Sequence, residues 1–339
     1  MQQEKYFKIL SIDGGGTKGA YSLSVLKQLE DKYCKEDETL SNYFDMFCGT
    51  SVGGSMALGL SCGCRVQKLI DMFYDNVEDI FPGNNSVWLV DKISEAYGGL
   101  KQFLGCKYGD DQLKKSVEAH FKEKQLKDVK SAVCVPTYNI TTGSNFVFKY
   151  PCEHLKNIDL KDVVLSTSAA PTYFPLHEIK SRELKGCFLD GGVWANNPTL
   201  VGITESLDNY VGKDKKYEKY AVLSIGNINL NTSSTPWSLS HFFNIFNLSY
   251  LITILFNGDS QSIHNYVKSI SEHLECPYIR MEETNVHYAS GDYGLDNSNK
   301  KYLEHLNNLA NNYVDDILKT DGSIKTDIFF ENHKTLVIY

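Results

Sequence analysis

Arginine is scarce in this sequence. Only Arg65, Arg182 and Arg280 occur among 339 residues, every other basic residue is lysine, and the formal net charge is −8. Binding along a nucleic-acid backbone needs clustered basic side chains, and bidentate hydrogen bonding to phosphate groups needs arginine. The composition therefore predicts that nucleic-acid backbones are not partners of this protein.

Paired cysteines and a targeting segment are also missing. The nine cysteines are an odd number and are scattered along the chain, with Cys62 and Cys64 as the only close pair. This pattern indicates reduced thiols, and without a second pair at zinc-finger spacing it predicts no metal site. The first residues lack the apolar core of a targeting peptide. We expect a cytoplasmic protein that uses no metal or other cofactor.

Long apolar runs are absent as well, although one window carries no formal charge. No Lys, Arg, Asp or Glu occurs between Lys219 and Asp259, and the segment Phe242–Phe256 is dense in Phe, Leu and Ile. Polar residues interrupt this segment too often for a transmembrane helix, which needs about 20 mainly apolar residues. The window is therefore predicted to be core or a lipid-facing surface.

Strand-like and helix-like patterns alternate along the chain. Apolar runs at Phe7–Ile12 and Phe44–Cys48 each precede a glycine-rich turn and then a segment with helical periodicity. Further strands are predicted at 131–138, 145–150, 187–189 and 220–225. This order is typical of an α/β fold with a mostly parallel central sheet covered by helices on both faces, in three layers.

A glycine-rich loop, Asp13-Gly-Gly-Gly-Thr-Lys-Gly19, joins the first strand to the first helix. Backbone N–H groups and the helix dipole favour an anion at such a place. The loop alone fits a dinucleotide-binding turn, the phosphate loop of sugar kinases, or an oxyanion hole formed by Gly14, Gly15 and Gly16. The kinases place a β-hairpin after their loop, whereas helical periodicity follows here, which disfavours the kinase interpretation.

The pentapeptide Gly49-Thr-Ser51-Val-Gly53 lies between the second predicted strand and the next helix. It has the G-x-S-x-G pattern in the context where a sharp turn exposes a nucleophilic serine. A serine hydroxyl attacks well only when a base takes its proton. All nine histidines follow Ser51, and none has a glycine-rich or strand-end setting.

Asp190 is the other candidate base. It ends an apolar run and precedes Gly191 and Gly192, so its carboxylate is expected at a strand end, where α/β active sites collect. An ordinary turn aspartate shows the same local pattern. A free aspartate, with a pKa of about 3.9, is a weak base. We therefore predict that Asp190 is partly buried, since burial raises the pKa of a carboxyl group.

Taken together and in this order, Asp13–Gly19, Gly49–Gly53 and Asp190–Gly192 resemble the three signature motifs of the patatin-like phospholipase family. Ser166–Pro175 and Asn196–Pro198 are similar to stretches that flank the dyad aspartate in that family. The resemblance covers roughly residues 7–280. It implies one patatin-like catalytic domain over 1–339, with 281–339 as a peripheral C-terminal extension. The segment 75–110 is harder to interpret and is expected to be a surface excursion.

The resemblance also implies roles for single residues. Ser51 would attack an ester carbonyl while Asp190 takes its proton, and the N–H groups of the three loop glycines would hold the oxyanion, without a metal. Lys18 stands where the family usually has arginine, which keeps the charge but loses the guanidinium fork. The residues implied to support the motifs are Lys18, Gly19, Gly49, Gly53, Gly191 and Gly192.

The function implied is a lipid acyl hydrolase that releases fatty acids from membrane phospholipids through an acyl-enzyme. Some short members of the family are antiphage effectors that respond to a cyclic nucleotide, but no motif here shows a nucleotide sensor. One alternative is an α/β-hydrolase esterase whose Ser-Asp-His triad uses a later histidine such as His241 or His264. The alternative of another class is a nucleotide- or phosphate-binding, kinase-like protein that uses the loop at 13–19.

The charge-free window divides into two parts. Residues 220–226 are predicted to be a core strand, while 237–256 fall where the family carries apolar helical segments near the site. The aromatic side chains of this second part are predicted either to pack in the core or to contact lipid. Lipid contact would make the enzyme peripherally membrane-associated when active. The residues concerned are Trp237, Phe242, Phe243 and Phe246.

Overall fold

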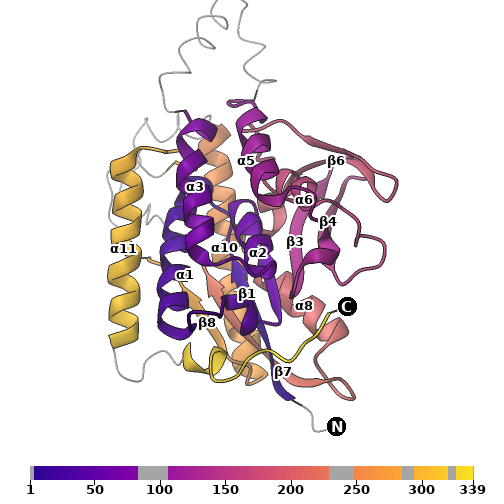
Figure 1. Ribbon diagram of the computed structural model, residues 1–339, viewed down its shortest axis with the longest axis vertical. Coiled ribbons are helices and arrows are strands. Elements are labelled where there is room, and N and C mark those ends of the chain that lie inside the picture. Colours follow the sequence, from indigo (N-terminus) through magenta and orange to yellow (C-terminus); the bar gives the residue numbers. More distant parts are fainter. Residues whose placement is uncertain (1–3, 83–105, 229–247, 285–293, 320–325, 339) are drawn as a thin grey trace, which may run out of the picture.

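A mixed sheet of eight strands runs through the computed structural model, which describes residues 4–82, 106–228, 248–284, 294–319 and 326–338 (Figure 1). The order across the sheet is β5-β6-β3-β2-β1-β7-β8, and β4 pairs with β3. The strands are β1 (Glu4–Ile12), β2 (Met46–Gly49), β3 (Ala132–Asn139), β4 (Ser144–Tyr150), β5 (His177–Lys180), β6 (Lys185–Asp190), β7 (Tyr217–Ile225) and β8 (Tyr278–Met281).

The central part of this sheet is parallel. Strands β8, β7, β1, β2 and β3 pair in parallel, whereas β4, β5 and β6 are antiparallel and lie at the β3 end. The predicted α/β class with a mostly parallel sheet is confirmed. Each strand predicted from the sequence is present, whereas β5 and β8, which are only four residues long, were not predicted.

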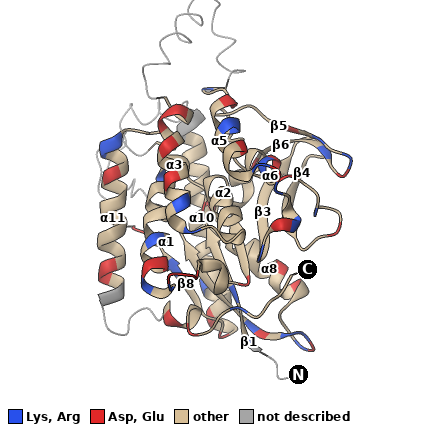
Figure 2. Ribbon diagram, viewed as in Figure 1, with Lys and Arg blue, Asp and Glu red and all other residues tan. Residues whose placement is uncertain are grey.

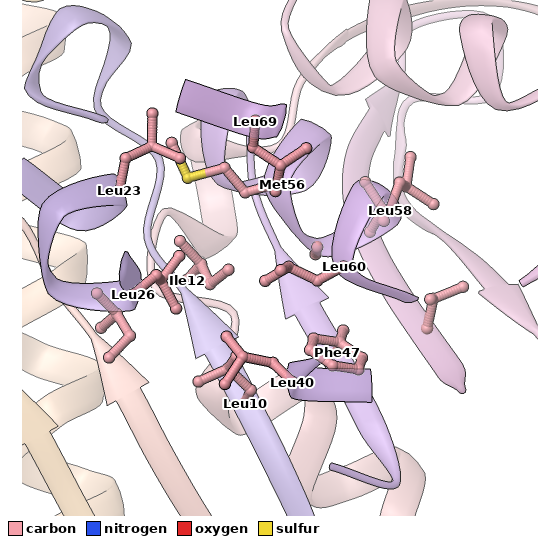
Figure 3. Packing of buried hydrophobic residues seen from close by; sticks show 14 of the residues in the cluster. Leu10, Ile12, Leu23, Leu26, Leu40, Phe47, Met56, Leu58, Leu60 and Leu69 are labelled. Carbon is pink, nitrogen blue, oxygen red and sulfur yellow. The ribbon is translucent and has the colours of Figure 1, made fainter. Parts of the chain in front are cut away.

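Helices cover both faces of the sheet. Side chains of β1 alternate between two core clusters: Leu10 and Ile12 pack with α1 and α2, while Phe7 and Ile9 face Ile203 of α8. Figure 3 shows the first cluster between the sheet and its helices. The predicted three layers are therefore present. The α-helices are α1 (Gly19–Tyr33), α2 (Val52–Ser61), α3 (Val66–Ile80), α5 (Asp111–Phe121), α6 (Leu160–Thr167), α7 (Gly192–Ala195), α8 (Thr199–Asn209), α10 (Leu248–His273) and α11 (Lys300–Lys319).

The described part of the C-terminal segment belongs to the core. Helix α11 packs against α1, and its Leu306 and Val314 are fully buried (Figure 1). After it, the fully buried Phe329 stacks on Phe44 beside β2. The prediction of a peripheral extension at 281–339 is thus wrong, because a stripe of apolar residues on a largely polar helix supplies core packing.

The prediction of a surface excursion at 75–110 also needs correction. Its first residues continue α3, and Val77 on that helix is buried in the main core. Residues 83–105 lie outside the described part of the chain. None of the described helices combines the length and the apolar character that crossing a bilayer requires.

Strand β3 brings two strand ends together. The first half of β3 pairs with β2, up to Cys134, and its second half pairs with β6, where Asp190 lies opposite Thr137. Since these same β3 residues also pair with β4, both β2 and β6 occupy the opposite edge. β2 is parallel to β3 and β6 is antiparallel, so their carboxyl ends meet head to head beside Pro136. The loop after β2 and the end of β6 therefore share one place.

Candidate active site

Ser51 occupies a sharp turn between β2 and α2. Its backbone has φ 55° and ψ −127°, a positive φ that is unusual for a residue with a side chain. The turn is possible because strand and helix approach very closely. A Cβ added at Gly49 would lie 2.1 Å from the Gly53 carbonyl oxygen, so no larger residue fits at Gly49. This is the geometry of a nucleophile elbow.

The turn is anchored by Thr167, the last residue of α6. The N–H of Ser51 donates to Thr167 Oγ1 at 3.0 Å, and this hydroxyl donates to the Pro136 carbonyl at 2.6 Å. Thr167 belongs to the run Ser166–Pro175 that carried part of the sequence resemblance, although its role was not predicted. The bonds connect the strained nucleophile to the point on β3 where the two strand ends meet.

Asp190 lies beside Ser51 and is fully buried, whereas the sequence predicted only partial burial. Its Oδ1 accepts a hydrogen bond from the Gly192 N–H at 2.7 Å, while its buried Oδ2 has no partner of standard geometry among the described residues. Burial raises the pKa of Asp190 to about 7, and the Ser51 hydroxyl and the Gly192 N–H partly oppose this rise. The carboxylate can therefore take a proton from Ser51 near neutral pH.

Gly191 and Gly192 pack closely against neighbouring segments behind Asp190. A Cβ on Gly191 would lie 2.2 Å from the Pro136 carbonyl oxygen, and one on Gly192 would lie 2.6 Å from the Phe256 ring. Larger residues at these positions would displace either β3 or α10. The pair thus allows the chain to turn from β6 into α7 directly beneath the carboxylate.

The glycine loop reaches the same place from β1. Among its N–H groups, that of Gly14 donates to the Asn196 carbonyl at 3.0 Å, whereas no acceptor among the described residues pairs with those of Gly15 and Gly16. Gly16 has φ +56° and borders the cavity that contains Ser51 and Asp190. The loop therefore offers two free donors, and the expected donation by Gly14 to an oxyanion does not fit this structure.

A buried ion pair holds the beginning of the loop. The Arg280 guanidinium donates to both carboxylate oxygens of Asp13, at 3.1 and 2.7 Å, and Ser260 Oγ donates to Asp13 Oδ2 at 2.9 Å. The charge of Asp13 raises the pKa of Arg280, which stays protonated. Arg280 was noticed in the sequence only because arginine is rare. Its position on β8, far along the chain from the loop, gave no local signal of this role.

Gly19 and Lys18 lie at the transition from the loop into α1. A Cβ on Gly19 would lie 3.0 Å from side-chain atoms of Val52 and Met56, so glycine lets α1 approach α2. Lys18 is 2% exposed, and burial lowers its pKa to about 8. Its ammonium group has no hydrogen-bond or ion-pair partner within the described ranges.

An apolar cavity opens beside Ser51 and Asp190. Its walls come from α2, α3, α5, α6 and the Phe256 end of α10, and they are almost entirely aliphatic or aromatic. Sequence reasoning did not identify α3 and α5 as parts of the site. The spacing of Leu69, Phe73, Val77 and Ile80 on one face of α3 was the available signal.

The alternatives from the sequence find no support in the described geometry. No histidine lines the cavity, and His264 instead pairs through Nδ1 with the Tyr278 hydroxyl at 2.9 Å. His241 lies outside the described residues, as do Trp237, Phe242, Phe243 and Phe246. The glycine loop is followed by a helix rather than a hairpin. Within the described ranges no group of three His, Cys, Asp or Glu side chains could hold a metal ion.

Comparisons with known proteins identify the family of this chain. Residues 10–203 match the patatin-like phospholipase family. A cGAMP-activated phospholipase from Escherichia coli (strain TW11681) is 29% identical over 317 residues, covering 88% of this chain and 86% of that protein. The cGAMP-activated phospholipase of Vibrio cholerae is also 29% identical, covering 88% of each chain. The structure of human GIVD cytosolic phospholipase A2 has a TM-score of 0.41 and 11% identity, covering 91% of this chain and 58% of that one. Because the family match spans more than half of its residues, this protein belongs to the patatin-like phospholipase family.

Proposed function

We propose that the protein, a lipid-ester hydrolase by its family, releases fatty acids from membrane phospholipids with a Ser51–Asp190 dyad. One observation carries the proposal: a serine on a strained elbow lies beside a fully buried carboxylate at the wall of an apolar cavity. The serine supplies a nucleophile, the carboxylate a base, and the cavity a place for an acyl chain.

The first half of the reaction forms an acyl-enzyme. Asp190 takes the hydroxyl proton as Ser51 Oγ bonds to the ester carbonyl carbon, and the carbonyl oxygen becomes an oxyanion. The free N–H groups of Gly15 and Gly16 donate to it, each worth roughly 2.7–4 kcal/mol if placed as in other serine hydrolases. The bond to the alcohol oxygen then breaks, and that oxygen takes the proton from Asp190.

The second half frees the enzyme. Water attacks the acyl carbon while Asp190 takes one of its protons, and the second tetrahedral intermediate releases the fatty acid as the proton returns to Ser51 Oγ. The raised pKa of Asp190, about 7, suits both directions of transfer. A carboxyl group with an ordinary pKa would be a much weaker base.

The apolar lining of the cavity suits a fatty acyl chain. Helix α3 lines it from Leu69 to Ile80, and this stretch of helix spans roughly 16 Å. The Ile80 end packs against the cluster that contains Phe256 and Leu295, near the catalytic residues. The Leu69 end lies against Gly59, about 12 Å along α2 from Ser51. Figure 3 shows Leu69 beside Met56, with Leu23 close by, at this inner end.

Membrane contact is part of the proposal. On α10, Leu251, Ile254 and Leu255 are 37%, 43% and 58% exposed, and no charged residue occurs from Leu248 to Gly258. By contrast, Figure 2 shows acidic and basic residues interspersed along the outer helices α1, α3 and α11. Phe256 follows directly and lines the acyl cavity. An uncharged apolar ridge at the cavity suits contact with the lipid surface from which the substrate is taken.

Activation by a cyclic nucleotide is the remaining part of the proposed function. Two relatives that each cover 88% of this chain are named cGAMP-activated phospholipases, which supports cGAMP as an activator here and a role as an antiphage effector. Hydrolysis measured with and without added cGAMP tests the first point. Equal rates at all cGAMP concentrations would contradict it.

The central experiment is incubation with mixed phospholipid vesicles, with and without cGAMP, followed by mass spectrometry of the products. Wild type should release fatty acids, and Ser51→Ala and Asp190→Ala should release none while keeping the circular dichroism of the wild type. Fluorophosphonate should label wild type but not Ser51→Ala, and Ser144→Ala, which changes an exposed serine on β4, should label normally. Near-normal turnover by Asp190→Ala would show that another base acts.

A further inference from the structure

Asn227 lies against the glycine loop, although it comes 213 positions after Gly14 in the chain. Strand β7 pairs in parallel with β1, with Ile225 opposite Ile12, so the segments that follow the two strands leave the sheet side by side. The Asp13 N–H donates to the Ile225 carbonyl at 3.0 Å and continues this pairing into the loop. Asn227 therefore reaches the loop directly after β7 ends.

The side-chain amide of Asn227 has a partner on each side. Its Nδ2 donates to the Gly14 carbonyl at 2.5 Å. The buried hydroxyl of Ser22, on α1, lies 3.0 Å from its Oδ1 and 3.1 Å from the Gly226 carbonyl, and can donate to both. Because a carbonyl oxygen only accepts hydrogen bonds, the amide nitrogen must be the atom that faces Gly14. The approach is close, since a Cβ added at Gly15 would lie 2.4 Å from Nδ2.

This contact determines the direction of the Gly15 N–H. The Gly14 carbonyl and the Gly15 N–H belong to one planar trans peptide and point in opposite directions. Because the carbonyl points to Asn227, the N–H points away from Asn227. Ser51 lines the acyl cavity and Asn227 does not, and a Cβ added at Gly14 would lie 3.3 Å from the Ser51 Cβ. The N–H is thus turned toward the side of the loop on which the nucleophile lies.

We propose that Asn227 is a positioning residue of the oxyanion hole and acts through the peptide between Gly14 and Gly15. The inference rests on the proposed function, since it requires an oxyanion at the Gly15 N–H. No other donor within the described ranges pairs with the Gly14 carbonyl, so without Asn227 the peptide can rotate and take the N–H out of the hole. Hydrogen bonds in a row also polarise one another, so donation by Ser22 and Asn227 strengthens the Gly15 N–H as a donor.

Asn227→Leu removes both hydrogen bonds of the amide and keeps the branching of the side chain. For a soluble ester we expect kcat to fall by roughly 10- to 100-fold while KM changes less than about twofold, because the oxyanion exists only in the transition state. Asn145→Leu is the matched control, since Asn145 is exposed on β4. Ser22→Ala keeps the bond to Gly14 and should lower kcat less. The double variant should lose no more than Asn227→Leu alone, because both changes act through one chain of hydrogen bonds.

A long-chain alkyl trifluoromethyl ketone separates an effect on the oxyanion hole from a general disturbance of the fold. The Ser51 oxygen bonds to its carbonyl carbon, the hydroxyl proton passes to Asp190, and the carbonyl oxygen becomes an oxyanion with no leaving group to expel. Its inhibition constant should rise in Asn227→Leu by the same factor as kcat falls. A fatty alcohol of equal chain length occupies only the acyl cavity, so its inhibition constant should not change.

Ser51→Ala distinguishes this inference from the function on which it rests. If Ser51→Ala hydrolysed the ester, the proposed dyad would be wrong. If Ser51→Ala is inactive while Asn227→Leu keeps the kcat and the ketone affinity of wild type, only the positioning role of Asn227 fails. That role is also overturned if Asn227→Leu weakens the ketone and the alcohol equally, because this would indicate a distorted cavity. Circular dichroism checks folding, and if Asn227→Leu does not fold, the same comparison of the two inhibitors in Ser22→Ala decides.

Discussion

The N–H of Ser51 donates a 3.0 Å hydrogen bond to Oγ1 of Thr167, and this bond fixes the backbone of the nucleophile in its unfavourable positive φ. Because Thr167 Oγ1 also donates to the Pro136 carbonyl, one hydroxyl joins the elbow to β3. Thr167 is thus a positioning residue: it acts on the reaction through the placement of Ser51.

Thr167→Val keeps the shape of the side chain but removes the hydroxyl. We expect kcat for a soluble ester to fall by about 10²-fold, because a misplacement of the order of 1 Å has that effect. We also expect stability to fall by about 1–3 kcal/mol, since the buried Ser51 N–H and Pro136 carbonyl lose their partner. Thr167→Ser is the matched control and should retain most activity. Equal kcat values for Thr167→Val and Thr167→Ser would contradict the positioning role of Thr167.

The pKa of Asp190 predicts how the rate depends on pH. Asp190 must be ionised to take the proton from Ser51, and burial raises its pKa to about 7. The value of kcat/KM should therefore decline tenfold per pH unit below about pH 7 and level off above it. Stopped assays with a soluble ester from pH 5 to 9 measure this without a lipid surface. A flat profile across pH 5–7 would mean that Asp190 is not the base.

The same shift predicts a stability change in Asp190→Asn. The folded carboxyl has a pKa of about 7 against an ordinary value of 3.8, so between these pH values the folded state holds a proton that the unfolded state has lost. Wild-type stability should thus decrease as pH rises from about 4 to 7, whereas an amide stays neutral throughout. The variant should gain up to about 4 kcal/mol relative to wild type at pH 8 and little at pH 4.

Urea unfolding at pH 4.5, 6 and 8 measures this difference. The amide introduced by Asp190→Asn keeps an oxygen that can accept the Gly192 N–H, so packing and hydrogen bonding change little. Asp259→Asn is an informative comparison, since burial raises the pKa of Asp259 to about 6 and its gain should be smaller. A stability difference that does not depend on pH would contradict the raised pKa of Asp190.

The sequence predicts those parts of the site that depend on short stretches of chain. Ser51 requires a tight strand-to-helix turn, and Asp190 ends an apolar run before two glycines, so a short sequence pattern identifies each residue. No such pattern predicts that the two residues lie side by side. Their proximity depends on β6 pairing antiparallel along the edge of β3 that β2 has left free, which is a property of the assembled sheet.

Two further features depend on contacts between distant segments. The Gly14 N–H is engaged by Asn196, and Asp13 is held by Arg280, 267 positions later in the chain. The core packing of α11 was missed for another reason. Its apolar residues Leu303, Leu306, Ala310 and Val314 recur at helical spacing, but polar residues outnumber them, and composition alone suggested an outer position.

Leu69 should control the length of the acyl chain that the enzyme accepts. It lines the cavity at its inner end, so Leu69→Phe would fill space that the end of a long chain occupies. Each methylene kept out of the cavity loses about 0.8 kcal/mol, and exclusion of two should lower kcat/KM for long chains by roughly tenfold relative to shorter ones. A series of p-nitrophenyl esters of increasing chain length measures the preference.

Leu58 provides the control for this experiment. It is fully buried in the same cluster but does not line the cavity (Figure 3). Leu58→Met conserves volume and should leave the preferred chain length unchanged. If Leu69→Phe also left it unchanged while the protein stayed folded, the acyl chain would have to lie elsewhere.

The exposed ridge of α10 should govern binding to the bilayer. Replacing Leu251, Ile254 and Leu255 together with serine removes apolar surface that contact with lipid would bury. Full burial of one such side chain contributes about 1.5–3 kcal/mol, so even partial burial of three predicts a loss of roughly 10²-fold in vesicle binding.

Tyr266→Ser with Ile270→Ser is the control, because these side chains are 61% and 42% exposed on the same helix but farther from Phe256. Cosedimentation with phosphatidylcholine vesicles measures binding, and the ratio of phospholipid to soluble-ester hydrolysis should fall in parallel. If both sets of substitutions weakened binding equally, the membrane contact would not be centred on the cavity.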